Sequence, residues 1–315
     1  MKPIITIFEA IHNIGIEYLS EFAEVKLAYG VNRKKCLQLA SKSNAIVVKS
    51  VIQVDKELLN NASSLRVIGR AGTGIDNIDT SEAKKMNIPV LTVPTGNSVS
   101  AAEFTILQIL SLCRRLPEVI KATNENDFRR NLLEGRELNN KKVGLVGLGN
   151  VGLLVTERLK AFGCKILGYD PYLKEKSSFI SHGGVITDSF EQLLSEVDVL
   201  SFHSRLTPSN FHMMGRKQFQ KVKGGLLLVN CARAHLIDQN ALLEFLDNGK
   251  VAMASLDVIE PEPPFDLHPT EHNYQHKLLM HPRIIVTPHI GASTIEAQKR
   301  ISLDLAEQLR RVLLG

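Results

Sequence analysis

Short apolar runs rich in β-branched residues alternate with helical patterns along nearly the whole chain, and this alternation constrains the fold most strongly. In the first hundred residues, strands are expected at 4–8, 25–29, 45–49, 66–70 and 90–93. The segments between them, such as 16–22 and 33–40, carry apolar residues three and four positions apart, which indicates amphipathic helices. Strands that alternate with helices in this way predict a parallel sheet with helices on both faces.

A second series of the same kind follows a long apolar helix. Ser100 and Glu103 form a capping-box pattern that opens an apolar stretch at 104–116, and Pro117 is expected to kink or end this helix. A charged segment at 124–140 comes next. Six further strands are expected at 142–146, 165–169, 197–202, 225–230, 251–257 and 284–287. Six is the number of strands in a full dinucleotide-binding sheet.

The order of the two series predicts the domain organisation. A chain of 315 residues is long enough for two domains, and an amphipathic helix at 293–314 follows the second series directly. We therefore predict an α/β protein with two doubly wound parallel-sheet domains, in which a Rossmann domain at 99–289 is inserted into a flavodoxin-like substrate domain. The substrate domain would consist of residues 1–98 and 290–315.

Composition and charge exclude several classes of protein. With 44% hydrophobic and 23% charged residues, the chain is an ordinary globular protein rather than a disordered one. The net charge is +5, but basic residues gather only at Arg33-Lys34-Lys35 and there is no Trp, so no nucleic-acid surface is predicted. No apolar run reaches the ~18 residues that span a membrane, and the N-terminus lacks a signal-peptide core. Four scattered cysteines indicate free thiols, so a cytoplasmic location without a membrane partner is expected.

A glycine fingerprint at 143–152 predicts a nucleotide site. The segment runs from a strand through G-x-G-x-x-G into a helix. Gly147 would make the tight turn, Gly149 would let the backbone approach a pyrophosphate, and Gly152 would let helix and strand pack closely. Because other nucleotide-binding enzymes such as methyltransferases share parts of this pattern, the fingerprint predicts a class of ligand but no reaction.

The neighbouring residues narrow the ligand to NAD. Asn150 and Val151 lie at the helix N-terminus, where free N–H groups and the helix dipole favour phosphates. Asp170 ends the next strand, where an acidic side chain binds ribose hydroxyls and repels a 2′-phosphate. The inserted domain is therefore expected to bind NAD rather than NADP.

Three chemically capable residues follow strands of the second series. Arg233, Glu262 and His289 lie beyond strand ends, where doubly wound sheets bind their ligands. Hydride transfer to a 2-keto acid needs a proton donor, commonly histidine, and a fixed cation for the carboxylate. A carboxylate beside the histidine holds the useful tautomer. Spacing alone leaves Glu260 open as an alternative to Glu262.

At these residues the chain resembles the D-isomer-specific 2-hydroxyacid dehydrogenase family. The matching segments are 69–79, 94–103, 143–152 with 168–171, 229–233, 256–258 with 262–263, and 287–293. The resemblance implies an NAD-dependent enzyme that interconverts a D-2-hydroxy acid and a 2-keto acid. Within the family the likeness is closest to the branch that acts on 3-phosphoglycerate and 3-phosphohydroxypyruvate, the first step of serine biosynthesis. The alternatives are a glyoxylate or hydroxypyruvate reductase and, in another class, an NAD-sensing corepressor-like binding protein.

The resemblance also implies residue roles. Arg233 would bind the substrate and stabilise charge, His289 would be the acid/base, and Glu262 rather than Glu260 would be its partner. NAD contacts are implied for Thr73, Gly147, Gly149, Asn150, Val151, Gly152, Asp170, Ser204, Cys231, Ala232, Asp257, Gly291 and Ala292. The backbone around Ser50 and Gly74 would meet the substrate carboxylate in a cleft between the domains. A phosphorylated substrate needs a second anion site, for which the candidates are Lys49, Arg70, Arg129 and Arg130, each of which could instead be solvated or ion-paired.

Several positions depart from the family pattern. Ala234 and His235 stand where the family has two glycines, and Arg205 replaces a proline. The stretch 265–282 looks longer than usual. It contains His268, His272, His276 and His281. Its prolines suggest a solvated loop rather than a zinc site, and no metal is expected.

The resemblance carries two expectations about assembly and regulation. The family is usually dimeric through the helix at 98–116, so a homodimer is expected. The chain ends at Gly315, directly after the closing helix, whereas many relatives continue into a serine-sensing regulatory domain. No serine feedback of that kind is therefore expected.

Overall fold

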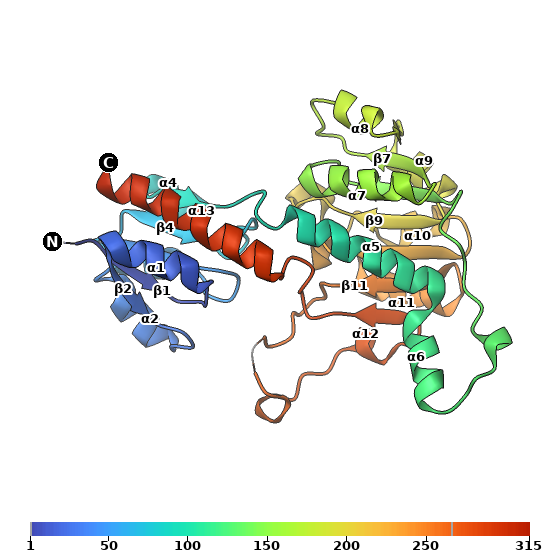
Figure 1. Cartoon of the computed structure of the whole chain (residues 1–315), viewed down its shortest axis with the longest axis horizontal. Coiled ribbons are helices and arrows are strands. Elements are labelled where there is room, and N and C mark those ends of the chain that lie inside the picture. The colour runs from blue at the N-terminus through green and yellow to red at the C-terminus, as the bar shows by residue number, and fades with distance from the viewer. Residues whose placement is uncertain (1, 266) are drawn as a thin grey trace. The chain divides into compact units, whose positions relative to one another are not determined.

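The structure is a computed structural model that describes residues 2–265 and 267–315 (Figure 1). It divides into two compact units, which are treated separately below. Unit 1 comprises Met1–Ser98 and Ser293–Gly315, and unit 2 comprises Val99–Ala292. Residues 1 and 266, which fall in the predicted substrate domain and in the histidine-containing stretch, lie outside the described residues.

Unit 1 is built on a five-stranded parallel sheet. Its strands are β1 (Ile4–Ile7), β2 (Glu24–Leu27), β3 (Ala45–Val48), β4 (Val67–Arg70) and β5 (Val90–Leu91). They lie in the order β2-β1-β3-β4-β5, which is the flavodoxin-like order. The sequence therefore predicted this sheet correctly.

Helices cover both faces of this sheet. They are α1 (Asn13–Phe22), α2 (Arg33–Ala40), α3 (Lys56–Asn61), α4 (Thr80–Lys85) and α13 (Ile295–Leu314). Ile5 and Ile7 pack on the side of α1 and α13, while Phe8 and Ile46 belong to the core of the opposite face. The two helices α1 and α13 lie side by side in Figure 1, and a Cβ on Gly15 would lie 2.7 Å from the carbonyl oxygen of Ser302. Only glycine allows this close approach.

Unit 2 is built on a seven-stranded parallel sheet. Its strands are β6 (Lys142–Val146), β7 (Lys165–Tyr169), β8 (Gly184–Ile186), β9 (Val199–Phe202), β10 (Leu226–Asn230), β11 (Val251–Leu256) and β12 (Ile284–Val286). Their order is β12-β11-β10-β9-β6-β7-β8. The prediction of six strands was wrong because it missed β8. This strand has three residues at the sheet edge and an exposed Val185, so it shows no apolar run.

The helices of unit 2 complete a three-layered α/β arrangement. They are α5 (Ser98–Arg114), α6 (Leu116–Asn124), α7 (Asn150–Ala161), α8 (Ser177–Ser181), α9 (Phe190–Glu196), α10 (Arg216–Lys221), α11 (Gln239–Asp247) and α12 (Lys277–Met280). The expected break near Pro117 is confirmed, because α5 ends at Arg114 and Arg115 adopts a left-handed conformation with φ of 51°. Among the helices of the described residues, none is both long and apolar enough to cross a bilayer.

The strand order of unit 2 determines where a ligand can bind. From β6 the chain first adds β7 and β8 on one side and then crosses to β9 on the other. Such a reversal leaves a crevice at the carboxyl ends of the two central strands. The glycine fingerprint lies directly after β6, so the fold places it at this position.

Candidate active site

The fingerprint turn joins β6 to α7. Gly147 has φ of 93°, and a Cβ there would lie 2.6 Å from the Ser204 nitrogen. A Cβ on Gly152 would lie 2.3 Å from the Gly147 carbonyl oxygen, so both positions require glycine. Around Gly149, the N-cap of α7, no described atom would come within 4 Å of a Cβ. The turn is therefore closely packed at Gly147 and Gly152 but open at Gly149, at the helix N-terminus. An approaching phosphate requires such an opening.

Polar groups flank this open side. The Asp170 carboxylate accepts the backbone N–H groups of Leu148 and Tyr172, each at 3.0 Å, which fixes it beside the fingerprint turn. The Ser204 Oγ and His203 Nε2 atoms, just after β9, are buried and make no hydrogen bond within the described part of the chain. Buried polar atoms of this kind normally find partners, so they fit a ligand that carries hydroxyl and phosphate groups. Asn150 and Val151 form the first turn of α7, so the residues present fit NAD.

Burial also determines the charge of this region. It lowers the pKa of His203 to about 4, so the ring is neutral near pH 7. Cys231 begins the turn after β10, and burial together with the negative charge of Asp257 raises the pKa of its thiol. Both side chains are therefore uncharged near pH 7.

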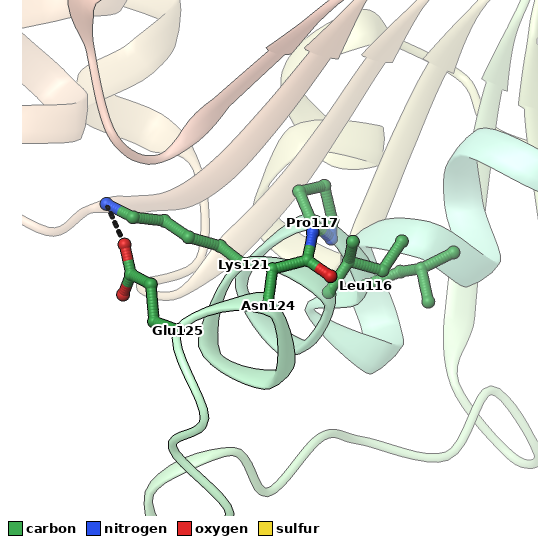
Figure 2. A pocket seen from close by; sticks show the side chains of 6 residues that line it. Leu116, Pro117, Lys121, Asn124 and Glu125 are labelled. Atoms are coloured by element: carbon green, nitrogen blue, oxygen red, sulfur yellow. Dashed lines mark ion pairs between the residues drawn. The ribbon is translucent and has the colours of Figure 1, made fainter.

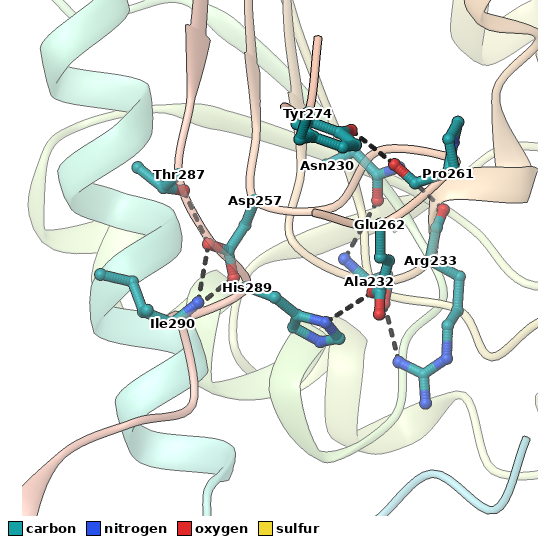
Figure 3. A network of polar contacts seen from close by, with 11 residues as sticks. Asn230, Ala232, Arg233, Asp257, Pro261, Glu262, Tyr274, Thr287, His289 and Ile290 are labelled. Carbon is teal, nitrogen blue, oxygen red and sulfur yellow. Dashed lines mark hydrogen bonds and ion pairs between the residues drawn. The ribbon is translucent and has the colours of Figure 1, made fainter. Parts of the chain in front are cut away.

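The end of β10 carries Arg233. Asn230, the last residue of this strand, is buried and braces the turn that follows it. Its Nδ2 donates to the Arg233 carbonyl at 2.9 Å, and its Oδ1 accepts the Ala232 N–H at 3.0 Å. The Arg233 Nη1 donates to the Ala232 carbonyl at 2.7 Å (Figure 3). The turn is thus held by its own side chains, and it presents a half-buried guanidinium.

Asp257 organises the ends of β11 and β12. Its side chain is 2% exposed and accepts three hydrogen bonds, from Thr287 Oγ1 at 2.6 Å, Ile290 N at 3.0 Å and Gly291 N at 2.8 Å. Its carbonyl accepts the His289 N–H at 2.9 Å. Burial raises the pKa of Asp257, and these hydrogen bonds and the nearby His289 oppose that rise.

These bonds hold the backbone of His289 in an unusual conformation. Its φ is 54°, in the left-handed region that non-glycine residues seldom adopt. The next residues must also turn sharply, since a Cβ on Gly291 would lie 2.9 Å from Asp257 Oδ2 and 3.0 Å from the Phe104 ring. Ala292 follows and is partly buried. Asp257 therefore acts as the anchor for the loop that carries the histidine.

The His289 side chain pairs with Glu262. Its Nδ1 lies 2.8 Å from Glu262 Oε1, and the two side chains are 33% and 39% exposed (Figure 3). A proton on Nδ1 that is shared with Glu262 leaves Nε2 to exchange a proton with a substrate. The structure thus brings Glu262, not Glu260, to the histidine. Because β10, β11 and β12 are hydrogen-bonded neighbours, Arg233, Glu262 and His289 all follow adjacent strand ends.

The residues predicted in unit 1 follow the strands β3 and β4, which pair with each other. Lys49 and Ser50 follow β3, whereas Arg70 ends β4, and Thr73 and Gly74 lie in the loop after it. The Lys49 Nζ donates to Gln298 Oε1 at 3.1 Å. Their ligand roles stay predictions.

Glu9 changes the expectation for Ser50. Its carboxylate accepts the backbone N–H groups of four successive residues, 49–52, at 2.7 to 3.2 Å. The Ser50 N–H, which was expected to meet a substrate carboxylate, is therefore already bonded within the protein. A substrate near this loop would need other donors.

Two of the arginines considered for a phosphate group, Arg129 and Arg130, follow α6 in the chain. Arg129 forms a two-bond ion pair with Asp127 at 2.9 and 2.7 Å, and this guanidinium lowers the pKa of Asp127 to about 2. Arg129 therefore forms an ion pair, which the sequence analysis had left open as the alternative to phosphate binding. Arg130 is exposed in a short 3₁₀ turn at Arg130–Leu132.

Sequence reasoning missed a buried polar chain behind the site. Gln108 on α5 is 4% exposed, accepts a hydrogen bond from Ser255 Oγ at 2.7 Å and donates to Thr287 Oγ1 at 3.3 Å. Thr287 in turn donates to Asp257. The sequence did contain a signal for this chain, because Gln108 is a polar residue inside the apolar stretch 104–116. Asn230, a polar residue at the end of the buried strand β10, was a similar signal for the turn that carries Arg233.

The described part of the connection between β11 and β12 contacts itself and α11. It contains a 3₁₀ turn at Pro269–Glu271 and α12, and its His281 lies 3.3 Å from Asp247 Oδ1. Among the described residues, no group of three or more His, Cys, Asp or Glu side chains is arranged to hold a metal ion.

Comparisons with known proteins agree with this geometry. The family model described as D-isomer specific 2-hydroxyacid dehydrogenase, NAD binding domain, matches residues 106–291. D-3-phosphoglycerate dehydrogenase of Methanocaldococcus jannaschii is 38% identical over 311 residues, which are 99% of this chain and 57% of that protein. D-lactate dehydrogenase from Aquifex aeolicus, crystallised with NAD and lactic acid, has a TM-score of 0.89 at 28% identity, covering 99% of this chain and 96% of its own. A glyoxylate reductase from Paecilomyes thermophila has a TM-score of 0.87 at 29% identity, covering 99% and 95%.

These matches establish the family. The chain belongs to the D-isomer specific 2-hydroxyacid dehydrogenases, and the matched part of unit 2 is their NAD-binding domain. The predicted family, the pair of parallel-sheet domains and the NAD cofactor are thus confirmed. The chain spans about half the length of the curated relatives it matches, between 50% and 57% for the first three.

Proposed function

We propose that the chain is an NAD-dependent dehydrogenase that interconverts a D-2-hydroxy acid and its 2-keto acid. The observation that carries this proposal is the hydrogen bond between His289 Nδ1 and Glu262 Oε1, on a strand end adjacent to that of Arg233. A histidine oriented by a carboxylate, next to a fixed cation and an NAD domain, supplies what reduction of a keto group requires.

Each group has a defined task in this reaction. Bound NAD supplies the hydride acceptor, and in the reverse direction the hydride donor. In reduction, His289 Nε2 gives a proton to the oxygen that becomes the hydroxyl, and in oxidation it takes that proton back. Glu262 keeps the other ring nitrogen protonated and the ring oriented. Arg233 binds the substrate carboxylate through its planar guanidinium and stabilises the charge on the reacting oxygen.

The proposed substrate pair is 3-phosphoglycerate and 3-phosphohydroxypyruvate, which would place the enzyme at the first step of serine biosynthesis. The relatives named D-3-phosphoglycerate dehydrogenase support this choice, because they match nearly the whole chain. Lys49 and Arg70 remain the proposed phosphate-binding residues, since they lie at the carboxyl ends of the neighbouring strands β3 and β4. Solved structures named as a glyoxylate reductase and a D-lactate dehydrogenase favour an unphosphorylated substrate as the second candidate.

One panel of substrates tests these proposals. NADH oxidation should be measured with 3-phosphohydroxypyruvate, hydroxypyruvate, glyoxylate and pyruvate, using His289→Ala as the inactive control. We expect the phosphorylated substrate to give the highest kcat/KM. A higher kcat/KM for glyoxylate or hydroxypyruvate would reject the phosphate assignment. Tight NADH binding without turnover of any 2-keto acid would favour a corepressor-like role instead.

We also propose a homodimer formed through the surface of α5 and α6. Exposed apolar side chains gather along these helices and the segment after them, namely Leu107, Leu116, Ile120, Phe128 and Leu132. A pocket on α6 is lined in part by Leu116, Pro117 and Ile120. Figure 2 shows the Lys121–Glu125 ion pair among its lining residues. Apolar surface of this kind is typical of subunit interfaces. Sedimentation should show a dimer for the native chain and a monomer for Ile120→Asp, and an unchanged mass for that variant would reject this surface.

We propose a cytoplasmic location because the cysteines form no disulfides. All four are free thiols in the structure, and two of them, Cys36 and Cys113, are buried. Free thiols are typical of reducing compartments.

A further inference from the structure

We propose that the long connection between β11 and β12 braces the turn that carries Glu262, and that Tyr274 and His276 are positioning residues for this carboxylate. The inference rests on the function proposed above, because it concerns how Glu262 is held against His289. It goes beyond that function by giving the connection a task in the reaction.

The turn that carries Glu262 has few backbone N–H groups with which to form hydrogen bonds of its own. Residues 260–264 read Glu-Pro-Glu-Pro-Pro, and proline provides no backbone N–H. The carbonyl groups are therefore the main backbone atoms by which neighbouring segments can fix this turn. The carboxylate of Glu262 itself is engaged with His289.

Tyr274 holds the carbonyl directly before Glu262. Its hydroxyl donates to the Pro261 oxygen at 2.6 Å, as Figure 3 shows. The ring is partly buried and packs against the hydrophobic core of unit 2. Burial and the negative charges of Glu260 and Glu262 raise the pKa of Tyr274, so its hydroxyl keeps its proton and stays a donor.

His276 holds the carbonyl one residue earlier. Its Nδ1 accepts the Leu278 N–H at 3.2 Å as the N-cap of α12. The proton of the neutral ring therefore lies on Nε2, which is 3.0 Å from the Glu260 oxygen and donates to it. The Tyr274 and His276 rings are stacked with an interplanar angle of 16°, so the two donors form one unit.

Gln239 closes the brace from the start of α11. Its Nε2 donates to the Glu260 oxygen at 3.0 Å, and its Oε1 accepts the Glu260 N–H at 3.3 Å. Glu260 is thus held from two elements and Pro261 from one. Since Glu262 follows these two residues directly, its backbone position is determined by the brace.

The test removes single donor atoms. Tyr274→Phe deletes only the hydroxyl, and Tyr18→Phe in unit 1, whose hydroxyl accepts from Arg310 at 3.3 Å, is the matched control. We expect Tyr274→Phe to lower kcat for 2-keto acid reduction roughly 10-fold, with KM and the Kd for NADH within about twofold. His276→Phe should behave in the same way, whereas His276→Gln, which keeps an N–H donor, should restore most of the activity. Tyr18→Phe should leave kcat unchanged.

A double-variant cycle separates positioning from a general structural role. If Tyr274 acts through Glu262, Tyr274→Phe should have almost no further effect on kcat in a Glu262→Gln background. An equal loss of kcat in both backgrounds would overturn the proposal.

A second readout does not depend on turnover. Amide hydrogen exchange over residues 257–265 should be faster in Tyr274→Phe than in the native chain and unchanged in Tyr18→Phe. If no 2-keto acid is turned over, the proposed function fails while this measurement still tests the brace. Unchanged exchange in Tyr274→Phe would overturn it.

Discussion

His203 should make the stability of unit 2 depend on pH. Burial lowers the pKa of this histidine from 6.5 to about 4, while in the unfolded chain it keeps its ordinary value. Between these two values the unfolded chain binds a proton that the folded protein does not. Acid therefore favours unfolding, so stability is complete above about pH 6.5 and falls as the pH drops towards 4.

The size of this effect follows from the two pKa values. At about 1.4 kcal/mol per pH unit, the full difference corresponds to roughly 3 kcal/mol. At about pH 5 somewhat more than half of it is already lost, so we expect a loss of roughly 2 kcal/mol between pH 7 and pH 5.

The assay is urea unfolding followed by circular dichroism at several pH values in this range. His203→Gln has no titrating side chain, and His182→Gln removes another histidine of the same unit as a control. The stability of the native chain relative to His203→Gln should fall by roughly 2 kcal/mol as the pH is lowered from 7 to 5. His182→Gln should keep the pH dependence of the native chain. If His203→Gln and the native chain lose stability in parallel, the imidazole is not shielded from the proton and the reasoning is wrong.

Three further outcomes are expected. Glu262→Gln should lower kcat for 2-keto acid reduction roughly 100-fold in steady-state kinetics, whereas Glu260→Gln should stay within about twofold, because only Glu262 reaches His289. Gln108→Met should reduce the free energy of unfolding by about 2 kcal/mol in urea denaturation, since it leaves the buried Ser255 hydroxyl without its acceptor, and a loss below about 0.5 kcal/mol would contradict this. Asp170→Ser should shift the ratio of the Kd values for NADPH and NADH about tenfold in favour of NADPH in a fluorescence titration, and an unchanged ratio would remove Asp170 from the ribose site.

Much of the fold could be predicted because it is encoded locally. Strands such as β3 and β10 are continuous apolar runs, and the fingerprint combines a strand, three glycines and a helix within one short segment. β8 escaped because an edge strand needs only one buried face and can be very short. Local patterns were therefore sufficient for fully buried strands such as β3 and β10, but they missed the short, partly exposed edge strand β8.

The site could be predicted only where the position of a residue after a strand indicates its place in the fold. Arg233 and His289 follow adjacent strand ends, as the sequence predicted, while their roles stay predictions. Spacing could not decide between Glu260 and Glu262, of which Glu262 contacts the histidine. The contacts of Gln108 and the capture of the Ser50 N–H by Glu9 join residues far apart in sequence. Such pairs leave no periodic signal, so only the three-dimensional structure shows them.

The arrangement of β10, β11 and β12 has a consequence for how such an enzyme can diversify. Each strand end carries one of the three proposed catalytic residues, and each is separated from the next by a complete return of the chain to the amino ends of the strands. A connection can therefore gain or lose residues without shifting the register of the strand that carries its neighbour. The long segment between β11 and β12 illustrates this freedom, because it lengthens one connection while both flanking strands keep their parallel pairing. Substrate preference could thus be exchanged loop by loop on an unchanged scaffold.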